Sequence, residues 1–487
     1  MRRGIAVAII SAAMCLTGIV AANATVVGWG GRDVTFTPPT LNGPVDAMIQ
    51  LKVGTNAGKY LIGGSFTNAG GNAAIDYVAR LNADGTIDTG FTSPVLSAGT
   101  GTCNDGGTTS PTLTVRTLLE TQTTSGSNTA GKIYIGGNFT NASGDAKMDY
   151  LIRVNASGGA ANTGFYPTGN GLSTGTVSYT NCVQTMFTAE GSGATLNLVV
   201  GTQANGVSKE VFDTGANATG FTSPTINPSS GAITSGFYCT SGCGGNRYVL
   251  GGGFSGINSD TKLARLVRLT TAGAVDTTAY PTTDGTSAGT VLFDAKVNSI
   301  ALDTSDNSIL VGGKFTGKIA KVALSNFAPA AGYTAPVSGT GSTLDGDVWS
   351  VAVDPTDPED PIGGNPSYVF AGGFTDGGDK PQCDYICNSD TSGNVGWYFE
   401  SPPPTDVVRV VTVNSHADTN VGKYMIGGAF TDLGGNTSTD YVARLNQATP
   451  ASITINSAGG NNAGGTDGIR TFYSNGQWQV LREGAGQ

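Results

Sequence analysis

The sequence has little of what most enzymes and nucleic-acid-binding proteins use. Its 487 residues include one histidine, and only 12 % are charged, with 25 basic and 35 acidic residues. A net charge of −10 disfavours nucleic acid or an anionic lipid surface as a partner, because both are bound through basic patches. A Ser/His/Asp triad would depend on His416, which lies in the polar stretch Asn414 to Asp418, where a solvated loop is predicted. We therefore predict that the protein is not an enzyme.

Long apolar runs are also missing, apart from one at the start of the chain. Arg2 and Arg3 precede the apolar stretch Ile5 to Val20, and Ala22-Asn23-Ala24 fits a cleavage site. This pattern predicts a secretion signal and a secreted or cell-surface protein that begins at Thr25 and does not insert into a membrane. The mature chain keeps 23 basic and 35 acidic residues, a net charge of −12.

Two other interpretations of the apolar start are disfavoured. A lipoprotein signal at Cys15 would follow a poor lipobox, Ala12-Ala13-Met14. A pilin-like segment cut after Gly4 would lack the acidic fifth residue of such segments.

Cysteine is scarce, and its distribution favours disulfides. Cys15 leaves with the signal, so six cysteines remain in an oxidising compartment. Two pairs are close in the chain, which leaves the remaining two for each other. The predicted disulfides are Cys239–Cys243, Cys383–Cys387 and Cys103–Cys182. A four-cysteine zinc site made by the two close pairs stays open as the alternative.

Glycine, by contrast, is abundant, and it marks an internal repeat. Among 75 glycines, a Gly-Gly pair (Ala-Gly-Gly in one copy) between an apolar strand and a phenylalanine recurs six times. The copies are Tyr60–Phe66, Tyr134–Phe139, Val249–Phe254, Leu310–Phe315, Val369–Phe374 and Tyr424–Phe430. Their spacing of roughly 60 residues leaves one double gap, which a degenerate copy at Leu198–Gly201 fills. We predict seven repeats of short strands.

Each repeat continues past the glycines with further shared positions. The aspartates are Asp76, Asp149, Asp384 and Asp440, followed by Tyr77, Tyr150, Tyr385 and Tyr441, and the arginines are Arg80, Arg153, Arg268 and Arg444. The first copy then has Asp84-Gly85, a hairpin signal, and a segment that ends at Phe91. A residue repeated at one offset is more often part of each blade's packing than a ligand. We expect each arginine to pair with an aspartate of the repeat and the aspartates to hold turns or ion pairs.

This pattern resembles the delta-60 repeat family, a domain-of-unknown-function β-propeller. The family's typical line is a Gly-Gly-x-Phe strand followed by Ala-Arg-Leu-Asn-x-Asp-Gly and Asp-x-x-Phe, and the resemblance covers about Val45 to Ile455. It implies an all-β, seven-bladed propeller of short antiparallel blades and an extracellular protein, and it implies no biochemical activity. Physical reasoning points the same way, because a single small sheet buries its faces poorly whereas seven packed radially cover one another.

The predicted domains are a secretion signal (1–24), an N-terminal extended segment (25–44), the seven-repeat propeller (45–456) and a C-terminal hairpin tail (457–487). Terminal strands would close the ring, and Asp33–Thr37 and Arg470–Leu481, with Asn475-Gly476 as a turn, are the candidates. Alternatively, Thr25 to Thr37 adds to an open edge of a second copy and builds a filament.

Candidate ligand sites are few. No cofactor is predicted, although calcium stays open because two loops are rich in acidic residues without the spacing of an EF-hand. These loops contain Asp354, Asp357, Glu359 and Asp360, and Asp303, Asp306 and Asn307. The aromatic residues that could stack on a sugar are Trp349, Trp397, Tyr398 and Trp478. Glycosylation sequons occur at Asn138, Asn141, Asn155, Asn217 and Asn436.

These observations favour a non-catalytic extracellular structural or adhesive β-propeller, with assembly into a surface layer or filament as one form of that role. Its partners would be copies of itself, other surface proteins or glycans. The alternative is a carbohydrate-binding or glycan-processing propeller, which should carry exposed aromatics with carboxylates on one rim. A sialidase is disfavoured, because the nearest match to its repeated turn, Ser342 to Trp349, occurs once with the aspartate displaced by one position.

Overall fold

The structure is a computed structural model, which describes part of the chain. The described residues are 31–99, 103, 113–122, 130–159, 161–162, 164–165, 182–189, 196–203, 206–227, 232–261, 263–279, 293–336, 344–355, 367–375, 383–395, 403–416, 420–433, 439–446, 469–474 and 477–482. The chain divides into two compact units, 1–449 and 450–487.

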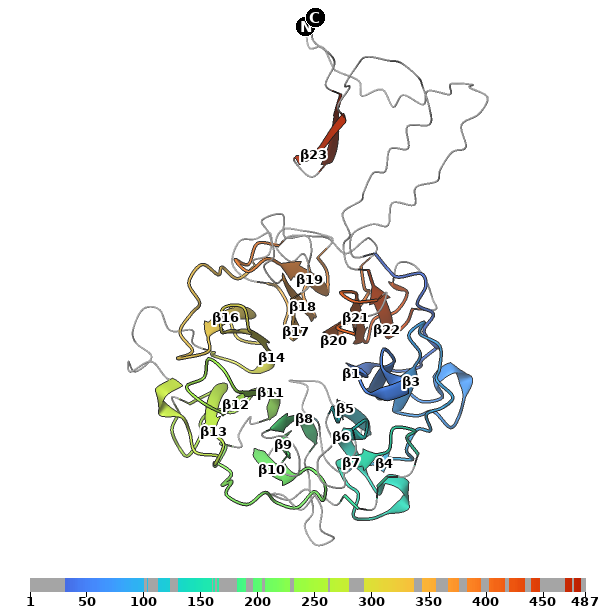
Figure 1. The fold of residues 1–487 in the computed structure, drawn as a ribbon, viewed down its shortest axis with the longest axis vertical. Helices are drawn as coiled ribbons and strands as arrows, with labels where there is room; N and C mark the ends of the chain where they lie inside the picture. The colour runs from blue at the N-terminus through green and yellow to red at the C-terminus, as the bar shows by residue number, and fades with distance from the viewer. Residues whose placement is uncertain are drawn as a thin grey trace, which may run out of the picture. The chain divides into compact units, whose positions relative to one another are not determined.

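The larger unit is built from seven small antiparallel sheets, and Figure 1 shows them arranged around a common centre. We number the sheets along the chain. Sheet 1 consists of β1 (Val45–Gln50), β2 (Tyr60–Gly64) and β3 (Val78–Leu81), and sheet 2 of β5 (Thr114–Glu120), β6 (Ile133–Thr140) and β7 (Leu151–Val154), with β4 (Ser97–Ala98) added beside β6.

The other five sheets repeat this order of three strands. Sheet 3 has β8 (Val183–Ala189), β9 (Asn197–Thr202) and β10 (Val207–Val211), and sheet 4 has β11 (Ile233–Cys239), β12 (Arg247–Gly252) and β13 (Leu266–Thr270). Sheet 5 has β14 (Val297–Asp303), β15 (Ser308–Gly313) and β16 (Ile319–Ala323), and sheet 6 has β17 (Val348–Asp354), β18 (Ser367–Gly372) and β19 (Ile386–Ser389). Sheet 7 has β20 (Val408–Val413), β21 (Tyr424–Gly428) and β22 (Val442–Leu445).

The first strand of each sheet lies nearest the centre (Figure 1), and each first strand contacts the first strands of its two neighbours, β1 and β20 included. The glycines allow this close approach. A Cβ on Gly63 would lie 2.6 Å from Cγ1 of Val115 in sheet 2, and a Cβ on Gly64 would lie 2.0 Å from the carbonyl oxygen of Pro44. Only glycine therefore fits at these two positions without movement of the neighbours.

The hydrophobic core is distributed between the sheets rather than gathered in one place. Seven clusters of buried apolar side chains occur among the described residues, and each is shared by two neighbouring sheets. The cluster between sheets 7 and 1 includes Val45, Tyr60, Met425 and Val442, and also Phe36 from the N-terminal segment. Sheets 7 and 1 thus share an interface like those between sheets that follow one another in sequence.

In the described part of the smaller unit, β23 (Ile469–Ser474) pairs with β24 (Gln477–Arg482) as an antiparallel pair. Asn475 and Gly476, where a turn is predicted, lie outside the described residues. Whether this hairpin contributes to closing the ring stays a prediction. Short 3-10 turns occur at η1 (Gly54–Asn56), η2 (Ala69–Gly71), η3 (Ala142–Gly144) and η5 (Thr277–Ala279). Within the described part of the chain, no helix has the length and apolar character needed to span a membrane.

Candidate functional site: contacts between sheets and seven bulge residues

The four repeated arginines join neighbouring sheets. Each lies in a third strand and is nearly fully buried, with 1–3 % of its surface exposed. The guanidinium of Arg80 bonds to Asp88 of its own repeat (2.6 Å) and donates to the carbonyl oxygen of Ala156, which follows the third strand of sheet 2. Arg153 likewise reaches the carbonyl of Asp213 (2.8 Å), beyond the third strand of sheet 3. The arginines therefore have the structural role that their repetition predicts. The expected pairing with an aspartate is wrong for Arg153, because Asn162 stands where Asp88 stands in sheet 1.

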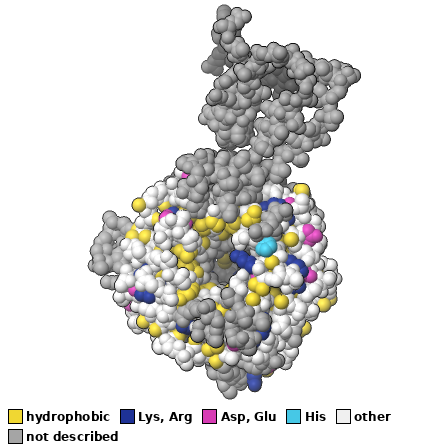
Figure 2. All heavy atoms as spheres, in the orientation of Figure 1, with side chains coloured by type: hydrophobic (Ala, Val, Ile, Leu, Met, Phe, Trp, Pro, Cys, Tyr) yellow, Lys and Arg dark blue, Asp and Glu magenta, His cyan; other side chains and the backbone are white. Residues whose placement is uncertain are grey.

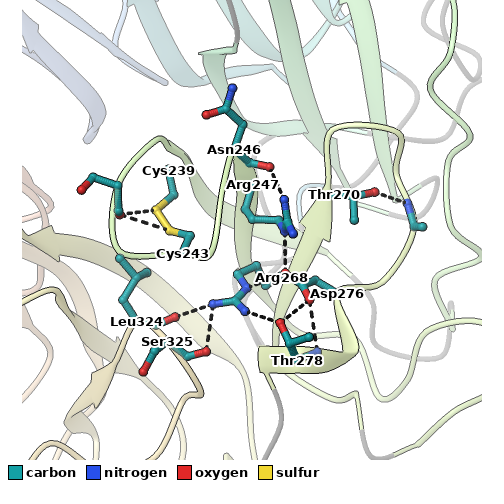
Figure 3. Close-up of polar contacts among 12 residues, drawn as sticks. Cys239, Cys243, Asn246, Arg247, Arg268, Thr270, Asp276, Thr278, Leu324 and Ser325 are labelled. Atoms are coloured by element: carbon teal, nitrogen blue, oxygen red, sulfur yellow. Dashed lines mark hydrogen bonds and ion pairs between the residues drawn. A yellow bond between two sulfur atoms is a disulfide. The ribbon is translucent and has the colours of Figure 1, made fainter.

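Figure 3 shows this contact at Arg268 of sheet 4. Its Nε lies 3.1 Å from Oδ2 of Asp276, and its Nη1 donates to the carbonyl oxygens of Leu324 (2.7 Å) and Ser325 (3.0 Å) of sheet 5. Arg247 pairs with the same aspartate. Burial alone would raise the pKa of Asp276, but hydrogen bonds from Thr278 and Arg247 and the charge of Arg268 lower it to about 2. The carboxylate therefore stays ionised between two cations.

The sequence pattern does not reveal that sheets 3, 5 and 6 carry other polar residues at the third-strand position of the arginines. The third-strand residues at this position are Lys209 of sheet 3, Lys321 of sheet 5 and Asn388 of sheet 6. Each pairs with the second-strand residue that is equivalent to the partner of an arginine in the other four sheets. Lys209 donates to the carbonyl of Thr271 in sheet 4 (3.3 Å), and Lys321 lies 5.0 Å from the ring centre of Tyr368 in sheet 6. In sheets 3 and 5 this position serves the same interface with different chemistry. The register of the strands identifies it.

Sheet 7 obtains its aspartate from the start of the chain. Asp33 lies 2.7 Å from both Arg444 and Lys423, as Asp88 lies 2.6 Å from Arg80 and 2.7 Å from Lys59. The backbone N–H of Asp33 donates to the carbonyl of Arg444 at 2.8 Å, the bond that Asp88 makes to Arg80 at the same length.

The residues after Asp33 continue the match. The ring of Phe36 lies 4.8 Å from the Arg444 guanidinium, and that of Phe91 lies 5.1 Å from Arg80. The sequence Asp33-x-x-Phe36 thus stands where the end of a seventh repeat would be, and Arg444 reaches onward to the carbonyl of Ala83 in sheet 1. We call the contacts of residues 31–37 with sheets 7 and 1 the seam.

The seam corrects one prediction. Residues 31–37 contact their own chain, and within them the described strand pairing is a single bridge, Arg32 with Leu445. Backbone groups that are already hydrogen-bonded within the chain cannot also pair with a strand of a second copy. This part of the segment therefore does not support filament formation by strand addition.

The repeated aspartates hold turns, as expected. Oδ1 of Asp76, Asp149 and Asp440 accepts the backbone N–H of a residue eight positions earlier, at 2.7–2.8 Å. The tyrosines that follow have left-handed backbones, with φ of 62–66°. In each case the N–H of the residue after the tyrosine bonds back to the aspartate carbonyl, which starts the third strand.

Two buried carboxylates proposed as calcium ligands instead accept tyrosine hydroxyls. Asp303 accepts from Tyr368 (2.6 Å), and Asp354 accepts from Tyr424 (2.9 Å), in each case from the next sheet. Asp306 is paired with Lys321 at 2.6 Å. Asp357, Glu359 and Asp360 lie outside the described residues. Among the residues that are described, no group of three or more His, Cys, Asp or Glu side chains could hold a metal ion.

Every first strand has the same irregularity, a β-bulge one residue after a fully buried Val or Ile. Bulges change the direction of a side chain and occur often at binding sites. Unlike the Val or Ile before it, the bulged residue varies, and six different residue types occupy it in the seven sheets. In order these bulge residues are Asp46, Arg116, Gln184, Thr234, Asn298, Trp349 and Arg409.

Three bulge residues meet across three sheets. Arg409 of sheet 7 lies 2.6 Å from Asp46 of sheet 1, and Arg116 of sheet 2 lies 3.8 Å from the same carboxylate oxygen. Thr114 donates its hydroxyl to the other oxygen at 2.9 Å. Figure 2 shows a hollow at the centre of the sheets with basic side chains at its edge.

Of the aromatic ligand candidates, Trp349 is described. It is a half-buried bulge residue of sheet 6, and the ammonium of Lys314 lies 5.6 Å from its ring centre. Trp397 and Tyr398 lie outside the described residues, and the side chain of Trp478 is not described. The sequence therefore identified Trp349 as a candidate ligand residue, but it did not identify Lys314 beside it.

His416 lies just past β20 and is partly exposed, and the histidine is visible at the surface in Figure 2. Its backbone N–H donates to Oε1 of Gln50 (3.1 Å), which also accepts from Ser415 (3.0 Å). These bonds join sheets 7 and 1 through the backbone.

The six cysteines described lie in three bonded pairs. Cys103 is joined to Cys182, Cys239 to Cys243 and Cys383 to Cys387, with Cα atoms 5.1, 6.3 and 5.0 Å apart. The two close pairs belong to sheets 4 and 6, which are not neighbours, so their four sulfurs do not converge on a zinc ion.

Four of the five sequons can be placed. Asn141, Asn155 and Asn217 are exposed, whereas the side chain of Asn138 is fully buried in β6. A glycan does not fit in a packed interior, so Asn138 is withdrawn as a candidate. Asn436 lies outside the described residues.

Comparison with known proteins supports the repeat type. Residues 58–91, which span β2, β3 and the Asp88-x-x-Phe91 segment, match the family model described as "Domain of unknown function (DUF5122) beta-propeller". No curated protein matches the chain.

Among solved structures, the chain is similar to the crystal structure of BBS1N in complex with ARL6DN. The mercury-soaked form has a TM-score of 0.42 and 9 % identity over 88 % of this chain and 96 % of that one. The lead-soaked form has a TM-score of 0.45 and 10 % identity over 86 % and 96 %.

Proposed function

We propose that the chain is a closed seven-bladed β-propeller of the delta-60 type that is exported and acts as a non-catalytic structural or adhesive scaffold. The observation that carries the proposal is that the repeated charged residues bond neighbouring sheets to one another. The four buried arginines all donate to carbonyls of the next sheet, and Asp33 and Asp88 complete equivalent sites. These groups hold the sheets together and are not available for catalysis.

Closure is proposed from the contacts between sheets 7 and 1. They share a hydrophobic cluster, the Asp46–Arg409 ion pair, and a hydrogen bond from Nδ2 of Asn414 to the hydroxyl of Tyr60 (2.6 Å). A closed ring leaves few free sheet edges, which suits a rigid scaffold that presents loops to a partner. Two-dimensional averages of single particles should show a ring of seven sheets, and an open arc would contradict closure.

Export is proposed from the basic and apolar start of the chain and from the paired cysteines. The protein should be recovered from the culture medium with Thr25 as its N-terminal residue. Retention inside the cell with an intact Met1 would refute export.

The non-catalytic role is tested with the mature protein and panels of oligosaccharides, esters and peptides. We expect no turnover, and we expect any ligand to be recovered unchanged after stoichiometric binding. A hydrolytic activity that disappears in His416→Ala would refute the proposal. A carbohydrate-binding scaffold is the second candidate, favoured by the position of Trp349 among charged side chains.

A further inference from the structure

At the bulge of each first strand, a constant buried residue is followed by a variable one. The Val or Ile before each bulge is fully buried. In six sheets it packs closely against a glycine of the preceding sheet, so that a Cβ added to that glycine would lie only 2.5–2.7 Å from its side chain. The next residue has the same backbone irregularity in all seven sheets but a different side chain in nearly every one. In sheets 4 and 5 the bulge residue bonds to the next sheet, since Thr234 and Asn298 donate to the carbonyls of Val297 (2.6 Å) and Val348 (2.9 Å). Elsewhere a position with constant geometry and varied chemistry is suited to recognition.

Charge is concentrated at one side of this set. Arg409, Asp46 and Arg116 come from three adjacent sheets and carry a net charge of +1, in a chain whose net charge is −10. The side chain of Asp46 is 1 % exposed, whereas that of Arg409 is 23 % exposed. The buried aspartate therefore holds Arg409 in place, and the side chain of Arg409 is the more exposed member of the pair.

An aromatic ring occupies the equivalent position in the neighbouring sheet. Trp349 is the bulge residue of β17, which contacts β20, the strand that carries Arg409. Lys314 from sheet 5 lies 5.6 Å from the Trp349 ring and is itself paired with Asp347 at 3.1 Å. Trp349 and Arg409 thus occupy equivalent positions in two adjacent sheets whose first strands are in contact. The indole offers a flat apolar surface, and the guanidinium is a group that binds carboxylates.

We propose that this side of the ring binds an acidic sugar, with the sugar face on Trp349 and the carboxylate on Arg409. The inference deepens the proposed scaffold function, because it names the ligand class of a non-catalytic site. The carboxylate must displace water from one guanidinium while the sugar covers the ring, so both contacts contribute to affinity. Since the site is charged and partly exposed, binding weakens as salt is added.

The test uses mature protein, tri-galacturonic acid as the probe, and its fully methyl-esterified form as a neutral analogue. Titration is followed by calorimetry. We expect binding of the acid, at least tenfold weaker binding of the ester, and at least tenfold weaker binding of the acid by Trp349→Ala and by Arg409→Ala. Thr234→Val, a bulge variant in sheet 4, should bind as the unaltered protein does.

The melting temperature of each variant is measured first. If Arg409→Ala unfolds, Arg409→Lys, which retains the charge beside Asp46, replaces it and should still weaken binding. Absence of binding, equal binding of acid and ester, or unchanged binding in Trp349→Ala would overturn the ligand assignment while leaving the scaffold function intact. Hydrolysis of the probe would instead refute the scaffold function.

Discussion

Sheets 1 and 7 make the same contacts but obtain them from the chain in different ways. In sheet 1 the arginine and its aspartate are 8 residues apart, whereas in sheet 7 they are 411 residues apart. Sheets 1 and 7 share four further contacts. They are the hydrogen bond from the aspartate N–H to the arginine carbonyl, the lysine paired with the aspartate, the phenylalanine ring near the guanidinium, and the bond from the arginine to the next sheet. The repeat is therefore a unit in space, and residues 31–37 complete the one to which sheet 7 belongs.

If the two sheets are equivalent, removing the N-terminal segment should have the largest effect. Deleting residues 25–37 leaves Arg444 and Lys423 without Asp33, and a buried charge that loses its partner costs about 3–5 kcal/mol before the loss of Phe36 is counted. We expect loss of the cooperative unfolding transition in urea. A synthetic peptide of residues 31–37 should restore it in a concentration-dependent way, and a fully stable deletion variant would show that the seam is dispensable.

The close glycine contacts provide a second comparison. A Cβ on Gly63 would lie 2.6 Å from Val115, and one on Gly427 would lie 2.7 Å from Val45. Overpacking of this kind costs about 1–3 kcal/mol. Gly63→Ala and Gly427→Ala should therefore lower the free energy of unfolding by similar amounts, as measured by urea denaturation. An effect at Gly63 without one at Gly427 would mean that sheets 7 and 1 do not pack as the other neighbours do.

Acid should weaken both sheets together. Burial alone would raise the pKa values of Asp33 and Asp88, but their hydrogen bonds to lysine and arginine hold both below the ordinary value. These carboxylates bind fewer protons in the folded protein than in the unfolded one. Their contribution is therefore present above about pH 4 and is lost as the pH falls through the lowered values.

The expected result is a melting temperature that falls steadily below pH 4. Asp88→Asn and Asp33→Asn should each have a lower melting temperature at neutral pH and a shallower fall in acid. Unaltered pH dependence in both variants would contradict the pairing.

The smallest effect is expected at Val34, which sits between the seam contacts but is 73 % exposed. Val34→Ser should change the free energy of unfolding by no more than about 0.5 kcal/mol, because exposed substitutions away from packed or bonded groups are nearly neutral. This variant is the control for the deletion. A large loss would mean that the segment is held by contacts other than those of Asp33 and Phe36.

Much of the fold could be predicted from the Gly-Gly strands, because close approach of sheets demands glycine at fixed positions. The role of the arginines followed from their repetition. Sequence could not show that Lys209, Lys321 and Asn388 share the arginine position, since different chemistry at one register leaves no visible repeat. The bulge residues other than Trp349 were missed for the same reason.

The seam was partly predictable. Asp33 to Thr37 was expected as a closing strand, yet its decisive feature is the Asp33-x-x-Phe36 spacing, which matches the segment ending at Phe91. Two of the acidic residues that left calcium open, Asp303 and Asp354, were considered without their partners. Asp303 and Asp354 lie where a strand ends, within reach of a tyrosine from the next sheet.

The central claim is that Asp33 does in sheet 7 what Asp88 does in sheet 1, and parallel urea unfolding of Asp33→Ala and Asp88→Ala tests it most directly. Each variant leaves a buried arginine without its carboxylate, so each should lose about 3–5 kcal/mol of stability in a single transition. A loss confined to Asp88→Ala, with Asp33→Ala as stable as the unaltered protein, would contradict the account.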